Sequence, residues 1–292
     1  MPERGREMKR PYAFASMVLL CLTSAACSGA PSKDTLERVR TAGVLRVALT
    51  QANPPWNFLD SGNRPVGYDV DVAHEVARRI GAGGVRFIGT DFANFVGGIR
   101  ADRFDIVIAG QTITAKRRGE VDFSRPYAVN GVAIFVRKGN TGIGGLKDLP
   151  GKRVAVSEGT VQAEFARTRI RNAKVKTYRN ATLVLTDLSW GRADAALVSR
   201  LQGTYLAAKK GLAITPVGPI WHNYPLSMSF RKGSPAFKRA VDSAINDMVG
   251  DGTLSAISRR WLNGLDMAAE LRGMSPNAAI RQSGGRLERS AV

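Results

Sequence analysis

The sequence predicts an α/β protein built around a largely parallel sheet. Strand-like and helix-like segments alternate along most of the chain, and the pattern restarts after Gly139. The segment DIVIA (105–109) is apolar on both faces, which is typical of a strand buried in a parallel sheet. Together these observations indicate two successive βαβ-type units followed by a pair of C-terminal helices.

The first unit shows the helical period most clearly in GYDVDVAHEVARRI. Val72, Val76 and Ile80 form one apolar stripe of this helix. Asp69 and Asp71 stand at its positive N-terminal end, where carboxylates are favoured. The expected elements are a helix at 36–42, a strand at 44–49, a helix at 67–80, a strand at 85–89, a helix at 92–103 and strands at 105–109 and 131–139.

The second unit repeats this alternation and leads to a return segment and two helices. Its expected elements are a strand–turn–helix at 153–169, a strand at 175–178, a helix at 181–194, a strand at 195–199, a return segment near 224–234 and helices at 235–249 and 254–264. Ligands in open α/β sheets bind beyond the carboxyl ends of the strands. The polar turns after 44–49, 105–109, 153–157 and 194–198 are therefore expected to face a shared cleft. Residues 265–292 lack an apolar period, and we expect a disordered tail there.

The N-terminus predicts export. A basic stretch, MPERGREMKR, precedes a short apolar run and the small-residue exit TSAAC. We interpret residues 1–27 as a secretory signal and 28–35 as a linker. Cys27 follows Ser-Ala-Ala, so it is either the lipidated first residue of a lipoprotein or lies just after ordinary cleavage near Ala26. A lipid anchor would place the protein at the extracytoplasmic membrane surface, and ordinary cleavage would release it into the periplasm.

Composition excludes several classes of function. The formal net charge is +19, but the basic residues are spread along the chain without an aromatic-interleaved stripe, so we expect no nucleic-acid partner. The general bias is toward anionic ligands. His74 and His222 are far apart in sequence, and the pattern predicts neither a metal site nor a cofactor.

The stretch AGQTITAKRRGEVDFSRPY (109–127) follows the buried strand at 105–109. Gly110 allows close approach of a ligand to the backbone. Thr112 supplies a hydroxyl and an N–H, and Arg117 supplies a planar fork that matches a carboxylate. The spacing alone fits a carboxylate site and a capped turn with solvated cations equally well.

Several ordered motifs make the chain resemble the family 3 bacterial extracellular solute-binding proteins, which serve polar amino-acid ABC transporters. The motifs are GYDVDVAHEVARRI, DIVIAGQTITAKRRGEVDFSRPY, LPGKRVAVSEGTVQAEF, GRADAALVS, FRKGSPAFKRAVDSAI and DGTLSAISRRWLNG, and they span about residues 36–264. The resemblance implies a two-lobed, type II periplasmic-binding-protein clamp with a hinge of two crossover segments. It implies a monomer that captures an amino acid or related small carboxylate and delivers it to an ABC permease.

The resemblance also implies boundaries for the two lobes. Lobe 1 would comprise 36–128 and the return and C-terminal helices at 226–264, and lobe 2 would comprise 132–222. The hinge would lie near Tyr127–Gly131 and Asn223–Leu226.

By the same resemblance, Gly110, Thr112 and Arg117 match the residues that hold the ligand's α-carboxylate. Thr160 matches a donor from lobe 2 that joins on closure, and Phe92 matches an aromatic residue that packs on the ligand side chain. These positions extend the carboxylate site across the cleft.

Two positions depart from the family pattern. Ser199 stands where the family has an acidic residue that holds the ligand's α-ammonium, and Asn53 replaces an aromatic residue, although Trp56 is present at the neighbouring Pro-aromatic pair. A serine supplies no charge, and an unpaired buried ammonium is costly. The ligand therefore lacks an α-amine, or Glu158 or another acid substitutes.

Two further functions are compatible with the sequence. The same fold is found in exported dehydratases similar to cyclohexadienyl dehydratase, in which a cleft carboxylate acts as general acid, and Glu158 is the candidate here. A ligand-free sensor or accessory subunit is the other alternative, because Asn53 and Ser199 weaken the expected site.

Overall fold

The computed structural model describes residues 34–274. The predicted signal segment, most of the predicted linker and residues 275–292 lie outside the described residues. Within the described range, no helix is both long enough and apolar enough to span a bilayer.

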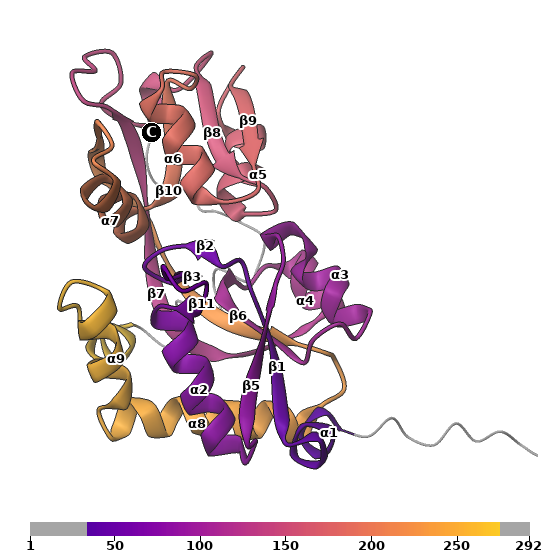
Figure 1. The fold of residues 1–292 in the computed structure, drawn as a ribbon. Coiled ribbons are helices and arrows are strands. Elements are labelled where there is room, and N and C mark those ends of the chain that lie inside the picture. The colour runs from indigo at the N-terminus through magenta and orange to yellow at the C-terminus, as the bar shows by residue number, and fades with distance from the viewer. Residues whose placement is uncertain (1–33, 275–292) are drawn as a thin grey trace, which may run out of the picture. The chain divides into compact units, whose positions relative to one another are not determined.

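Helices and strands alternate as the sequence predicts (Figure 1). The helices are α1 (Thr35–Ala42), α2 (Tyr68–Ile80), α3 (Phe95–Arg100), α4 (Ala115–Glu120), α5 (Val161–Arg169), α6 (Ala181–Ser189), α7 (Arg200–Lys210), α8 (Pro235–Gly250), α9 (Thr253–Trp261) and α10 (Met267–Gly273), with 3-10 turns at Phe92–Asn94 and Leu146–Asp148. The strands are β1 (Val44–Leu49), β2 (Ala52–Asn53), β3 (Asn57–Leu59), β4 (Pro65–Val66), β5 (Gly84–Gly89), β6 (Ile106–Thr112), β7 (Asp122–Arg137), β8 (Arg153–Ser157), β9 (Lys174–Tyr178), β10 (Ala195–Ser199) and β11 (Ile214–Phe230).

The main sheet contains two parallel sets of strands. Strands β1, β5 and β6 form one set, and β8, β9 and β10 form the other. The long strands β7 and β11 lie between the sets, antiparallel to each other and to their neighbours, in the order β5-β1-β6-β11-β7-β10-β8-β9. Below, lobe 1 denotes the elements around β1, β5 and β6, and lobe 2 denotes β8–β10 with α5–α7. Figure 1 shows β7 and β11 passing from one lobe to the other.

The two crossover segments of the predicted fold are the central parts of β7 and β11. They pair directly, with Ala128 opposite Leu226, Asn130 opposite Tyr224 and Gly131 opposite Asn223. The two-lobed arrangement with two crossovers is therefore present. The lobe boundaries and a hinge motion at these residues remain predictions.

Two segments differ from the expectations at the C-terminal side of the sheet. The sequence did not indicate α7, because its buried face holds only Gln202, Gly203 and Leu206 and its apolar stripe is correspondingly weak. The prediction of a disordered tail from residue 265 is wrong for the described part, where α10 forms. Met267 is fully buried, its N–H donates to Ser258 Oγ at 3.0 Å, and its sulfur accepts the N–H of Val129 at 3.1 Å.

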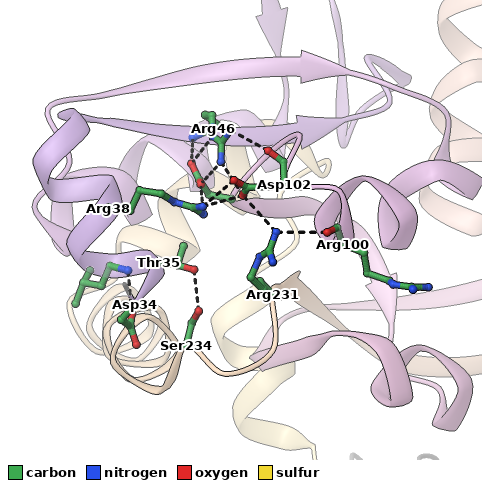
Figure 2. A network of polar contacts seen from close by, with 10 residues as sticks. Asp34, Thr35, Arg38, Arg46, Arg100, Asp102, Arg231 and Ser234 are labelled. Atoms are coloured by element: carbon green, nitrogen blue, oxygen red, sulfur yellow. Dashed lines mark hydrogen bonds and ion pairs between the residues drawn. The ribbon is translucent and has the colours of Figure 1, made fainter. Parts of the chain in front are cut away.

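An ion-pair network anchors the start of β6 to β1 and α1 (Figure 2). Asp105, which is 3% exposed, accepts from Arg38 Nη2 at 2.8 Å and from Arg46 Nη2 at 2.8 Å. Asp102 accepts from the same two guanidiniums, and Arg231 Nη2 lies 3.7 Å from its Oδ1. Because charge-assisted pairs with forked geometry are directional, this network fixes the strand whose far end carries the polar turn 110–117.

Candidate functional site

Eight of the nine predicted ligand-binding residues line one cavity between the lobes. Those eight are Asn53, Trp56, Phe92, Gly110, Thr112, Arg117, Thr160 and Ser199. The cavity lies beyond the carboxyl ends of β1, β6, β8 and β10, where α/β sheets place their ligands. The turns that the sequence grouped into a shared cleft are thus brought together.

Glu158 is the exception. It is exposed and does not line the cavity, whereas Ser157 and Thr160 do. Glu158 lies in the turn that follows β8, and its N–H donates to Tyr178 O at 2.8 Å. In this arrangement no contact brings Glu158 into the cavity, and its role as a substitute for the missing acid stays a prediction.

Arg117 is a buried cation in the wall of the cavity. Its Nη1 donates to Thr112 O at 2.7 Å, its Nη2 donates to Gly159 O in lobe 2 at 2.6 Å, and its Cζ lies 5.4 Å from the ring centre of Phe92. Among the described residues it has no carboxylate within ion-pair distance. Loss of solvation on burial lowers the pKa of Arg117 to about 10, so it remains a cation at neutral pH with its charge only partly compensated.

The helix that presents Arg117 begins immediately after the polar turn. Thr114 caps α4 by accepting the N–H of Arg117 at 3.2 Å. Gly110 has φ +64°, a left-handed conformation that favours glycine, and it places backbone in the cavity wall. The cap and the glycine together fix the path from β6 to the guanidinium.

A buried carboxylate, which the sequence indicated only as a residue at a helix start, is hydrogen-bonded to this turn through Tyr127. Asp69 is fully buried and accepts from Tyr127 Oη at 2.7 Å and from Asn57 Nδ2 at 2.7 Å. Tyr127 Oη in turn accepts the N–H of Gly110 at 2.8 Å. Burial raises the pKa of Asp69 to about 7, despite the two hydrogen bonds that favour its ionised form. The chain of bonds links α2 to the cavity wall.

Three helix N-termini form the lobe 2 wall. Thr160, Asn180 and Ser199 cap α5, α6 and α7, and all three line the cavity. Each cap accepts a backbone N–H from its own helix, and the hydroxyl of Thr160 also donates to Ser157 O at 2.7 Å. The hydroxyl proton of Thr160 is thus used in a hydrogen bond within its own turn.

Direct contacts join the lobes around the cavity. Asn53 Oδ1 accepts the N–H of Ala181 at 3.4 Å, and Thr182 Oγ1 donates to Ala52 O at 2.9 Å. Gly159 approaches Ala93 so closely that a Cβ on the glycine would lie 2.8 Å from the Ala93 Cα. Trp56 is buried at the cavity wall, with its ring edge-on to Tyr68 at 5.5 Å.

Ser199, at the position of the expected acid, is hydrogen-bonded within the protein. Ser199 is 4% exposed, and its hydroxyl donates to Asn130 Oδ1 at 2.7 Å. Its oxygen accepts the N–H of Gln202 at 3.4 Å. The Ser199 hydroxyl therefore donates one hydrogen bond and accepts another within the protein.

Sequence analysis missed several polar residues of the cavity, among them Asn130, Gln162, Arg179 and Gln202. Arg179 directly follows β9, so the rule that ligands bind beyond strand ends, applied to this strand as well, would have found it. Asn130 and Gln202 could not be found in that way, because one lies in the middle of β7 and the other in an unpredicted helix.

Comparison with known proteins identifies the family of this chain. The profile of the bacterial extracellular solute-binding proteins, family 3, matches residues 45–264. The L-cystine-binding protein TcyJ of Escherichia coli is 33% identical over 227 residues, which cover 77% of this chain and 85% of that protein. Cyclohexadienyl dehydratase of Pseudomonas aeruginosa is 25% identical over 260 residues, which cover 86% of this chain and 96% of the enzyme.

Solved structures show the same fold. An ancestral arginine-binding protein bound to glutamine superposes with a TM-score of 0.72 at 33% identity, covering 76% of this chain and 99% of that protein. The two-lobed type II clamp that the sequence predicted is confirmed. This chain belongs to the family 3 bacterial extracellular solute-binding proteins.

Proposed function

We propose that this protein captures a small carboxylate, an amino acid or a related acid, between its lobes and delivers it to an ABC permease. The observation that carries the proposal is the Arg117 guanidinium, which lines the cavity without a carboxylate partner among the described residues. A guanidinium of this kind matches a carboxylate in a bidentate manner. Gly110 and Thr112 lie beside it in the same wall.

The relatives support this class of ligand. One is named as an L-cystine-binding protein, and a structural neighbour is described as an arginine-binding protein bound to glutamine. We further propose that the protein is a monomer that works outside the cytoplasm, exported by its N-terminal signal. Cys27 is the proposed site of lipid attachment if the signal is of the lipoprotein type.

We propose a receptor rather than an enzyme, although one relative is a dehydratase. General acid catalysis of a dehydration needs a positioned proton donor, which Asp, Glu or His commonly supplies. None of the described residues that line the cavity is Asp, Glu or His, and Glu158 lies outside it. The Escherichia coli relative at 33% identity is named as a binding protein, which also favours the receptor.

A thermal-shift panel of amino acids and organic acids tests the proposal. The mature protein is first freed of carried-over ligand by unfolding and refolding. At a hundredfold excess over the dissociation constant, the true ligand adds about 2.7 kcal/mol to the free energy of unfolding. For a domain of this size we expect the melting temperature to rise by roughly 5–10 °C. No shift with any anionic metabolite would contradict the receptor and favour the ligand-free sensor.

Incubation with prephenate or arogenate gives the corresponding test of the enzyme. We expect no increase in the absorbance of an aromatic product. Formation of that product would show that the fold carries out the dehydratase reaction here.

A further inference from the structure

The lobe 2 wall of the cavity presents positive ends of helices. Thr160, Asn180 and Ser199, the caps of α5, α6 and α7, all line it. The N-terminus of a helix carries partial positive charge and favours anions. The wall opposite Arg117 therefore also favours negative charge. A ligand with one carboxylate, bound at Arg117, would place no negative charge against this wall.

The charged side chains of the cavity have the same sign. Arg117 lines it from lobe 1, and the exposed Arg179 lines it from the end of β9 in lobe 2. No Asp or Glu occurs among the described lining residues, and neither arginine forms an ion pair with a described residue. An ammonium group enclosed here would have no counter-charge, and burying an unpaired charge is costly.

The amide groups beside Ser199 offer NH2 donors to a ligand. The Ser199 hydroxyl donates to Asn130 Oδ1, which fixes the orientation of this amide and leaves its NH2 group as a donor. Gln202 is 7% exposed, and its Nε2 has no hydrogen-bond partner among the described residues. A buried NH2 group needs an acceptor, and an ammonium has none to give.

We propose that the ligand is a small dicarboxylate without an amine. One carboxylate binds at Arg117 in lobe 1. The other accepts from Gln202 and Asn130, in the field of Arg179 and the α7 N-terminus. This inference rests on the proposed function, because it specifies the ligand of the same cavity.

Isothermal titration calorimetry on the ligand-free mature protein compares acids that differ by their amine. L-glutamate is measured against glutarate and 2-oxoglutarate, and L-aspartate against succinate and malate. In at least one of these two series, we expect an amine-free acid to bind about tenfold or more tightly than the amino acid of the same chain length. This factor corresponds to a difference of about 1.4 kcal/mol in binding free energy. Tighter binding of the amino acid at both lengths would overturn the inference while leaving the proposed function intact. Binding of no acid and no amino acid would overturn both.

Ser199→Asp tests the position directly. Aspartate also caps helices, so the α7 N-terminus is retained. The new carboxylate should weaken dicarboxylate binding about tenfold or more and strengthen binding of the matching amino acid. Ser243→Asp, at an exposed serine of α8, is the matched control and should leave both affinities unchanged. An unaltered preference in folded Ser199→Asp would overturn the inference.

Gln202→Leu keeps the size of the side chain and removes the donor, so it provides a second test should Ser199→Asp fail to fold. Dicarboxylate affinity should fall about tenfold, a loss of the size expected for one buried hydrogen bond to a charged group.

Arg179→Gln should lower the affinity for dicarboxylates more than the affinity for monocarboxylates such as butyrate. Arg171→Gln, at an exposed arginine outside the cavity, is its control. Equal losses for mono- and dicarboxylates in both variants would contradict the second anion site.

Discussion

Replacing Arg117 by glutamine is expected to lower the affinity for the carboxylate ligand by at least about thirtyfold. Removing one partner of a desolvated, hydrogen-bonded charge pair costs about 2 kcal/mol or more, which corresponds to that factor. Titration calorimetry with the tightest-binding acid measures the loss. Arg117→Lys keeps the charge but loses the planar fork, and we expect it to bind with intermediate affinity.

Arg118→Gln is the matched control for this prediction. Arg118 is the next residue of α4, and its side chain is exposed and does not line the cavity. It should bind the ligand as the unaltered protein does. Because Arg117 also donates to Thr112 O and Gly159 O, the melting temperature of each ligand-free variant is recorded as a baseline. Equal affinities of Arg117→Gln and the unaltered protein would remove Arg117 from the site.

Asp69→Asn is expected to change the stability of the protein and its dependence on pH. At pH 5 the variant should lose about 1–3 kcal/mol of unfolding free energy, because an amide NH2 replaces one acceptor facing Tyr127 Oη or Asn57 Nδ2. The pKa of Asp69 is raised from 3.8 to about 7, so the folded state holds its proton over a range where the unfolded state has released it. Stability from this group is therefore fully present below pH 3.8 and is lost as the pH rises through about 7.

The measurement is the difference in unfolding free energy between the unaltered protein and Asp69→Asn from pH 5 to pH 8. Subtraction removes the contribution of the other carboxylates. We expect the advantage of the unaltered protein to shrink by about 2–3 kcal/mol across this window. Asp247→Asn, at an exposed carboxylate of α8, is the control variant and is measured over the same pH range. Parallel profiles for the unaltered protein and Asp69→Asn would contradict a raised pKa at Asp69.

Much of the candidate site follows from local sequence signals. A buried parallel strand, a glycine, two hydroxyls and an arginine occur within the single segment 105–117, so their proximity needs no long-range information. The rule that polar turns at strand ends share one cleft then brings Thr160 and Ser199 to the same cavity as Arg117. Both inferences depend on short-range geometry, which sequence patterns carry well.

The rest depends on contacts between distant parts of the chain. Asp69 has the pattern of a solvated carboxylate at a helix start, and only Asn57 and Tyr127, which meet it in the folded core, show that it is buried. Glu158 shows the opposite case. It lies in the turn between Ser157 and Thr160, yet its side chain is exposed and does not line the cavity as theirs do. Neither the core partners nor the face can be deduced from the local residues alone.

The most direct test of the account is to identify the small molecule that the protein carries when it is purified natively. Native mass spectrometry gives its mass and stoichiometry, and release followed by fragmentation gives its structure. The account predicts one molecule per chain with at least one carboxyl group, displaced by excess of the tightest-binding acid and lost in Arg117→Gln. A carried ligand without any acidic group, retained in Arg117→Gln, would contradict it.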